Sequence, residues 1–209
     1  MELLKNLYWR YATKKFDPTR EVNEADLDKL KKAVQLSVSS YGLQLYKVLI
    51  IKDPAIRKKL RPVSWDQSQI TDASHLFVFC NYTQAKASDI DAFIKLTADT
   101  RGWDLDRLNG YGDFIKSKLS EKSSEETSAW LKSQVYLALA NLLNACAELK
   151  IDACPMEGFE PEKYNEILNL EERGLNAAVI APVGYRHKED NTQTLPKVRK
   201  PLEKLFSVI

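Results

Sequence analysis

The stretch VYLALANLLNACA, from Val135 to Ala147, is apolar on nearly every side when drawn as a helix. It lies inside a longer segment that Ser123 and Glu126 open with a capping-box pair, so one long helix is expected, running to about Lys150. A helix of this kind must be covered on most of its surface. The chain is therefore expected to build layers around it, with cover from its own fold or from a subunit interface.

Helix and strand signals lie on both sides of this segment. Asn23 can cap a preceding helix that has one apolar face. The β-branched run at 46–52 predicts a strand. The apolar run at 75–82 does not alternate, which predicts a strand covered on both faces at the centre of a sheet. Another core strand is expected at 176–185.

Two segments look less regular. Residues 84–121 are charged with helical spacing, and the spacing is interrupted around Gly102, Gly110 and Gly112, so turns and a lid-like segment are expected there. The tail after residue 185 is basic, is broken by prolines and ends at Ile209. A tail of this kind packs poorly alone, and we expect it to lie over a partner in a homodimer.

Composition limits the classes of function. A length of 209 residues with 44% apolar content fits a single domain, 1–209. The formal net charge of +2 gives no global attraction to nucleic acid or to an anionic membrane. No apolar run approaches 18 residues, so a cytoplasmic protein is expected. Three cysteines without a C-x-x-C pair, and only two histidines, favour buried thiols over disulfides and predict no metal site.

The usual catalytic templates are missing. No phosphate-binding glycine motif and no G-x-S-x-G elbow is present. What stands out is a set of cations near both ends, Arg10, Lys14 and Lys15, then Lys197, Arg199 and Lys200. Such residues often form only a solvated helix face, and Arg10 and Lys14 would share a face if their segment were helical. Alternatively, the two clusters converge on one anion.

The stretch ACPMEGFEP, at 153–161, raises a separate question. Pro155 and Gly158 favour a bend around Glu157. The same residues fit a strand-to-helix turn in which Glu160 caps the next helix and Pro161 takes its first position. The two readings are compatible.

Taken together, short motifs in order resemble the nitroreductase family of flavin enzymes, of the FMN-dependent, NAD(P)H-using, oxygen-insensitive nitroreductase and dihydropteridine reductase type. The resemblance runs nearly end to end. It is carried by RYATKKFD near the start, SVSSYGLQLYK at 37–47, TDASHLFVFC at 71–80, LKSQVYLALANLL at 131–143, PMEGF at 155–159, VIAPVGYR at 179–186 and LPKVRKP at 195–201.

The resemblance implies an α+β fold with a central mixed, mainly antiparallel sheet flanked by helices. It also implies an intertwined homodimer that exchanges its C-terminal tails. It implies FMN as cofactor and NAD(P)H as co-substrate, with nitroaromatics, quinones or related small molecules reduced by a ping-pong mechanism. A flavin-storing or flavin-sensing protein with the same fold and little turnover is the alternative.

The resemblance also assigns residues to the cofactor site. The backbone N–H of Glu157 would face flavin N5, in a bend formed with Pro155, Met156 and Gly158. Lys14 would lie at the pyrimidine edge. Ser39 and Ser40 would come from the partner subunit. The phosphate and ribityl end would be held by Arg10, Lys197 and Arg199, with backbone groups of Tyr11 and Ala12.

The chain departs from the family pattern at several of these positions. Tyr11-Ala12 replaces a common His-Ser pair, which removes one hydroxyl contact. Asp66 and Gln69 stand where some members have an Asn and a Lys near the flavin, so one charge is missing there. Tyr41 replaces a Thr after the paired serines. Tyr41 and Phe114 are candidate substrate-binding residues.

Overall fold

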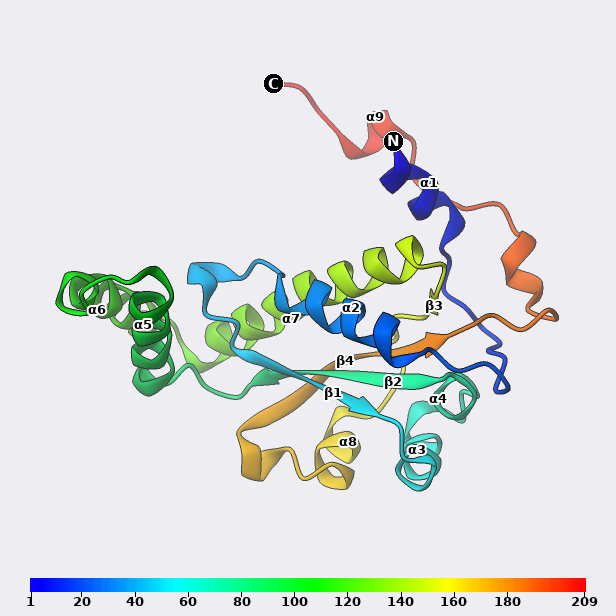
Figure 1. The fold of residues 1–209 in the computed structure, drawn as a ribbon, viewed down its shortest axis with the longest axis horizontal. Coiled ribbons are helices and arrows are strands. Elements are labelled where there is room, and N and C mark those ends of the chain that lie inside the picture. Colours follow the sequence, from blue (N-terminus) through cyan, green and yellow to red (C-terminus); the bar gives the residue numbers. More distant parts are fainter.

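The computed structural model describes residues 1–209, and its centre is a four-stranded sheet in the order β1-β2-β4-β3 (Figure 1). Each neighbouring pair of strands is antiparallel, so the four strands do not form the mixed sheet that was expected. The only parallel pairing is an isolated bridge between Ala12 and Ala153. The strands are β1 (Tyr46–Ile51), β2 (His75–Tyr82), β3 (Asp152–Ala153) and β4 (Leu175–Gly184).

The strand predictions are confirmed to within about one residue at each end. β2 spans 75–82 as expected and pairs with β1 on one side and β4 on the other. All but its last residue is buried, which explains why its apolar pattern does not alternate. The pairing of β2 with β4 shifts by one residue between Phe79 and Cys80, at a local irregularity.

Helices cover both faces of the sheet (Figure 1). Helices α2 and α7 lie on one face, over an apolar core that includes Phe77, Phe79 and Leu142. Helices α3, α4 and α8 lie on the other, where a second core surrounds Phe16 and Tyr164. The helices are α1 (Glu2–Trp9), α2 (Glu24–Gln35), α3 (Pro54–Leu60), α4 (Gln69–Asp72), α5 (Ala87–Arg101), α6 (Asp106–Ser120), α7 (Ser124–Glu148), α8 (Pro161–Ile167) and α9 (Leu202–Leu205).

Helix α7 begins with the predicted capping box, in which Ser123 and Glu126 satisfy each other's backbone N–H groups. Its buried residues lie against α2 and the sheet. Leu137 is nevertheless 42% exposed, and Ala140 is also exposed. Within one chain, the helix is therefore covered on one side only. Neither α7 nor any other helix has the length and apolar content needed to cross a membrane.

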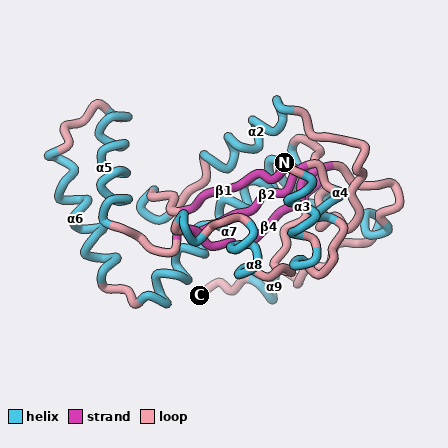
Figure 2. Tube along the Cα trace, turned by 90° about the horizontal axis from the view of Figure 1, so that it is seen from below, coloured by secondary structure: helices cyan, strands magenta, loops and turns pink.

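Helices α5 and α6 form an arm that stands to one side of the sheet (Figures 1 and 2). The arm has a small apolar core of its own, shared with the start of α7. Gly102 ends α5 with a φ of +64°, as a turn requires. The turns expected at Gly110 and Gly112 are wrong, because both glycines lie inside α6. A Cβ on Gly112 would lie 3.1 Å from Ile94, so this glycine permits close packing of the two helices.

Candidate cofactor site

Three basic side chains from opposite ends of the chain meet beside α1. Lys197 donates a hydrogen bond through Nζ to the carbonyl of Arg10, 187 residues away. Burial and then the charge of Arg199 lower the pKa of Arg10, and burial with the charges of Arg10 and Arg199 lowers the pKa of Lys197. None of the three forms an ion pair. Three mutually repelling cations without a carboxylate suit an anion such as phosphate.

Residues 10–16 are not helical, so the helical face considered for Arg10 and Lys14 does not exist. Helix α1 ends one residue earlier, and Arg10 has φ −72° and ψ 143°. Isolated bridges then pair Ala12 with Ala153, at the end of β3, and Phe16 with Arg186, two residues beyond β4. The segment is held by the sheet and not by helical hydrogen bonds.

Lys14 nonetheless extends the positive region toward the bend at 155–159. Burial raises the pKa of the Cys154 thiol, and the charges of Lys14 and then Arg10 oppose this rise. Both cations therefore lie near the residue that precedes Pro155. The Lys14 side chain is exposed and forms no ion pair. Its ammonium group is free for a ligand.

A buried carboxylate, Asp190, fastens the segment that carries these cations. It accepts hydrogen bonds from the amides of Lys14 and Lys15, at 2.8 and 3.1 Å, and from the Tyr11 hydroxyl at 3.0 Å. Burial acts to raise the pKa of Asp190, but the hydrogen bonds from Thr192 and the two lysine amides lower it to about 2. No local sequence pattern points to Asp190, because these three partners are 175 to 179 residues away.

Arg186 is a second residue that sequence reasoning missed. Its Nε donates to both oxygens of the buried Asp152, at 2.9 and 3.1 Å. Its guanidinium group lies over the rings of Trp9 and Tyr11, at 4.3 and 4.6 Å from the ring centres. Because Arg186 already has a carboxylate partner, it supports the site structurally and adds no free charge to it.

The bend at 155–159 leaves the backbone N–H groups of Glu157 and Gly158 without a partner in the chain. Met156 exchanges both backbone hydrogen bonds with Ile180 of β4, at 2.8 and 3.1 Å. All peptide bonds are trans, so the N–H of Glu157 points opposite to the Met156 carbonyl, away from β4. This N–H donates to no group of the chain, whereas the Glu157 carbonyl accepts from Phe159 at 3.0 Å. An outward N–H of this kind is available to a ligand.

Neighbouring loops hold the bend in place. A Cβ on Gly158 would lie 2.8 Å from the ring of Trp65, and Gln67 donates through Nε2 to the Gly158 carbonyl at 2.9 Å. Helix α8 begins at Pro161, as the sequence predicts, with Glu160 in the N-cap position. The expected capping bond from the Glu160 side chain is absent. The close approach of the Trp65 ring is the reason that position 158 needs a glycine.

Asp66 and Gln69 differ in their accessibility to a ligand. Asp66 is exposed, has a φ of +52° and precedes Gln67, which contacts the bend. Gln69 is only 5% exposed at the start of α4, and its side chain forms no hydrogen bond. Asp66 is therefore open beside the bend, whereas Gln69 is largely closed off.

Ser39 and Ser40 lie toward the opposite end of α7. The amide of Ser40 donates to Gln134 Oε1 at 2.7 Å. Arg10 lies near Cys146, since its charge opposes the rise that burial gives to the pKa of that thiol. Twelve residues of helix separate these two contacts, which is about 18 Å at 1.5 Å per residue. Within one chain, the serines do not join the cation cluster.

Of the two candidate substrate residues, Tyr41 follows the serines and Phe114 lies on the α5–α6 arm. Tyr41 has a φ of +57° and packs against the apolar core of the α5–α6 arm. Phe114 on α6 is 48% exposed and stacks with Tyr111, at 6.5 Å between ring centres. Tyr41 therefore contacts the core that the arm shares with the start of α7, and Phe114 adds exposed aromatic surface on the arm itself.

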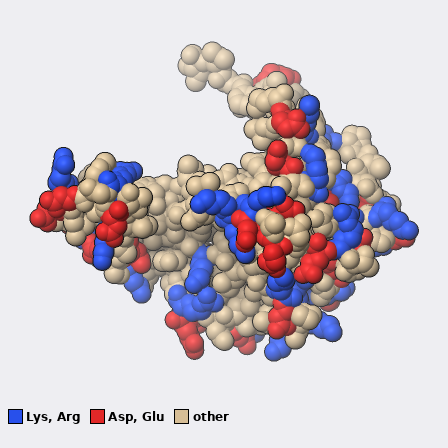
Figure 3. Space-filling model, viewed as in Figure 1, with Lys and Arg blue, Asp and Glu red and all other residues tan.

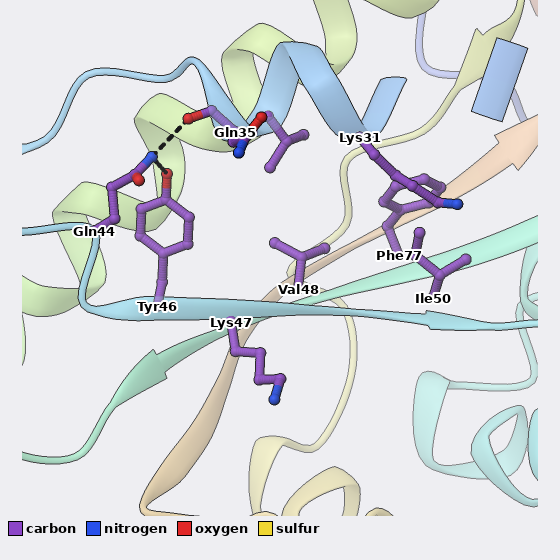
Figure 4. A pocket seen from close by; sticks show the side chains of 9 residues that line it. Lys31, Gln35, Gln44, Tyr46, Lys47, Val48, Ile50 and Phe77 are labelled. Carbon is purple, nitrogen blue, oxygen red and sulfur yellow. Dashed lines mark hydrogen bonds between the residues drawn. The ribbon is translucent and has the colours of Figure 1, made fainter. Parts of the chain in front are cut away.

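A hollow of about 350 Å³ lies between α2 and β1 (Figure 4). Tyr46, Val48 and Ile50 of β1 line it together with Phe77 of β2. None of the residues expected to hold the cofactor lines it. The hollow is thus separate from the cation cluster and lies beside an edge strand of the sheet.

The three cysteines are buried free thiols, as predicted. No group of three His, Cys, Asp or Glu side chains is arranged to hold a metal ion.

Comparison with known proteins identifies the family. Residues 7–185 match the profile of the Nitroreductase family. The chain is 33% identical to the major NAD(P)H-flavin oxidoreductase of Aliivibrio fischeri, over 99% of this chain and 98% of that protein. It is 30% identical to the oxygen-insensitive NAD(P)H nitroreductase of Salmonella typhimurium, over 97% of both chains.

Solved structures agree on the fold. A Bacillus subtilis protein assigned as a nitroreductase superposes with a TM-score of 0.90 at 17% identity, covering 100% of this chain and 99% of that one. An Exiguobacterium sibiricum nitroreductase, solved in complex with FMN, gives 0.85 at 16% identity, covering 100% and 96%. The fold, the family profile and the full-length relatives agree, and the chain belongs to the nitroreductase family of NAD(P)H-dependent flavin oxidoreductases.

Proposed function

We propose that this chain is an FMN-dependent oxidoreductase that uses NAD(P)H to reduce nitroaromatics, quinones or related small acceptors. One observation carries the proposal: Arg10, Lys197 and Arg199 converge without a carboxylate partner. A dianionic phosphate such as that of FMN would supply the missing counterion. The names of the Aliivibrio and Salmonella relatives and the FMN complex of the Exiguobacterium structure support the same cofactor.

Each part of the site has a role in this proposal. The cation cluster holds the phosphate, and backbone groups of Tyr11 and Ala12 contact the neighbouring ribityl chain. FMN, when bound, supplies a two-electron carrier that takes hydride from NAD(P)H and passes it to the acceptor. Lys14 stabilises negative charge at the pyrimidine edge, and the outward amide of Glu157 donates to N5.

The separation along α7 supports a homodimer. Arg10 and Ser40 are about 18 Å apart along the helix, so a single chain does not bring both to one flavin. A partner chain would supply Ser39 and Ser40. Figure 3 shows that the outline between the α5–α6 arm and the terminal segments is hollowed and carries few charged side chains. The exposed Leu137 of α7 also suits an apolar interface.

The C-terminal segment supports an exchange of tails in this dimer. Its apolar side chains are exposed, and those of Val208 and Ile209 touch almost nothing, at 102% and 119% exposure. Strand β1 is an edge strand, and the hollow beside it is lined by five apolar and four polar or charged residues (Figure 4). An unpaired edge next to a partly apolar hollow is suited to an added segment from another chain.

Two aromatic residues, Tyr41 and Phe114, support the reduction of a broad range of acceptors. In the proposed dimer, Tyr41 and Phe114 of one chain border the flavin held by the other. Stacking on a ring discriminates weakly among flat acceptors. NAD(P)H and the acceptor would occupy this crevice in turn, which gives ping-pong kinetics.

The test begins with an absorbance spectrum of the purified protein. A yellow protein with flavin bands is expected. Stopped-flow mixing with NADH and NADPH under argon should then bleach the flavin within seconds, and a nitroaromatic or a quinone should restore it. A colourless protein that binds no added FMN contradicts the proposal. Tightly bound flavin that NAD(P)H does not reduce would instead indicate a storage or sensing protein.

A further inference from the structure

The carboxylate of Glu157 is tied to helix α7. The hydroxyl of Tyr136 donates a hydrogen bond to its Oε1. Glu157 is otherwise exposed, and it forms no ion pair with any cation of the chain. The Tyr136 ring is partly buried against the core between α7 and the sheet. One hydroxyl on a rigid helix therefore fixes where this negative charge lies.

The donor in this bond keeps its proton. Burial, followed by the adjacent Glu157 carboxylate, raises the pKa of Tyr136 to about 12. At neutral pH the hydroxyl is therefore a hydrogen-bond donor to an ionised acceptor, which is the stronger class of hydrogen bond.

The position of this charge matters because the free amide belongs to the same residue. The Glu157 N–H points away from β4, and its side chain leaves from the adjacent Cα. A carboxylate released from α7 can swing toward the opening in front of the amide. Reduction adds negative charge to the ring, and an anion brought closer to the ring disfavours the reduced form.

We propose that Tyr136 is a positioning residue of the cofactor site: it holds the Glu157 carboxylate against α7 and so keeps that charge away from the reactive side of the ring. The inference rests on the proposed function, because it requires FMN at the bend. Nothing in it requires Tyr136 to touch the flavin.

The test compares four holoproteins: wild type, Tyr136→Phe, Glu157→Gln and the double variant. The measurements are the midpoint potential of bound FMN, the FMN dissociation constant and the melting temperature. When Glu157 is kept, Tyr136→Phe should shift the reduction equilibrium about tenfold toward oxidised flavin. A tenfold shift lowers the midpoint potential by about 30 mV for a two-electron couple. In the Glu157→Gln background, the same change should shift it less than about twofold, because no charge is released.

Two results would overturn the inference. An equal shift in both backgrounds would mean that Tyr136 acts by packing alone, and no shift in either would mean that the bond is irrelevant to the flavin. Tyr82→Phe is the matched control, since the Tyr82 hydroxyl has no hydrogen-bond partner, and it should leave the potential unchanged. A wild-type protein that binds no FMN would instead refute the proposed function itself, before any variant is compared.

Discussion

The pairing of individual charges separates structural from ligand-binding residues in this protein. Arg186 and Arg10 lie close to the same short strand, but Arg186 is paired with Asp152 and Arg10 is paired with no carboxylate. Burying a cation without a counterion is costly, so such an arrangement persists where a ligand supplies the charge. The residues without partners are therefore the informative ones for function.

Replacing Lys14 by alanine tests one of these unpaired charges. Lys14→Ala should weaken FMN retention or slow flavin reduction by NAD(P)H, because the negative charge gained on reduction loses its nearest cation. Flavin content after gel filtration and the stopped-flow rate with NAD(P)H are the measurements. Lys15→Ala is the control, since Lys15 is already paired with Glu189 at 2.5 Å on the surface. Unchanged flavin content together with an unchanged rate would contradict the assignment of Lys14.

Replacing Asp190 tests the residue that fastens the cationic segment. Its folded-state pKa of about 2 lies below the ordinary 3.8, so its contribution to stability is complete above about pH 4 and is lost as the pH falls toward 2. Asp190→Asn should therefore lower the free energy of unfolding at pH 7 by about 2 kcal/mol.

Urea unfolding at several pH values checks this prediction. The gap between wild type and Asp190→Asn should narrow as the pH falls from about 4 toward 2, because the unfolded chain takes up the proton first while Asp190 stays ionised in the folded protein. Asp28→Asn, at an exposed carboxylate paired with Lys31, should change little at any pH. A gap that stays constant from pH 7 downward would show that the charge of Asp190 does not stabilise the fold.

The sequence predicts the site residues unevenly, for reasons visible at single positions. The convergence of Arg10 with Lys197 and Arg199 followed from a family resemblance, because no local pattern links residues 187 positions apart. Asp190 remained hidden for the same reason. Spacing alone was misleading for Arg10 and Lys14, because isolated bridges at Ala12 and Phe16 hold that segment in a non-helical conformation.

At the scale of helices and strands, prediction succeeded where the signal is local. Asn23 caps α2, Ser123 caps α7, and the apolar run at 75–82 is β2. It failed at Gly112, because a glycine used for close helix packing looks the same in sequence as a glycine used for a turn. The difference lies in a contact with a distant side chain, which one sequence does not reveal.

The α5–α6 arm carries a prediction about acceptors. Phe114→Ala should raise KM for a nitroaromatic acceptor by about tenfold, through the loss of stacking area, while FMN retention stays unchanged. Steady-state kinetics at saturating NAD(P)H, with flavin content measured in parallel, provide the test. Leu96→Ala, an exposed apolar site on α5, is the control. A Phe114 variant with wild-type KM for several aromatic acceptors would remove this residue from the acceptor site.

At the scale of the whole molecule, the single chain leaves a large amount of apolar surface exposed to solvent. One side of α7, the edge of β1 and the C-terminal segment are all exposed in the single chain. The sequence indicated a partner through the apolar helix and the proline-broken tail. It could not indicate how two chains fit together, because that depends on the shape of a surface that no local pattern encodes.

Removing residues 202–209 tests the role of the tail while leaving Lys197 and Arg199 in place. The truncated protein should sediment with a larger monomer fraction than the full chain and should lose FMN more readily on dilution, because the proposed cofactor site draws on two chains. Sedimentation velocity at several protein concentrations is the measurement. Glu203→Gln, a single change within the removed segment, should leave assembly unchanged. Identical sedimentation of the truncated and full-length chains would exclude the tail from the interface.

The 18 Å of helix between Ser40 and Arg10 has a genetic consequence if each crevice draws on two chains. A chain damaged only at Arg10 and another damaged only at the paired serines would each form inactive homodimers. Co-expressed, they would assemble hybrids in which one crevice carries both lesions and the other carries none. Two defective alleles would then restore activity to each other by interallelic complementation.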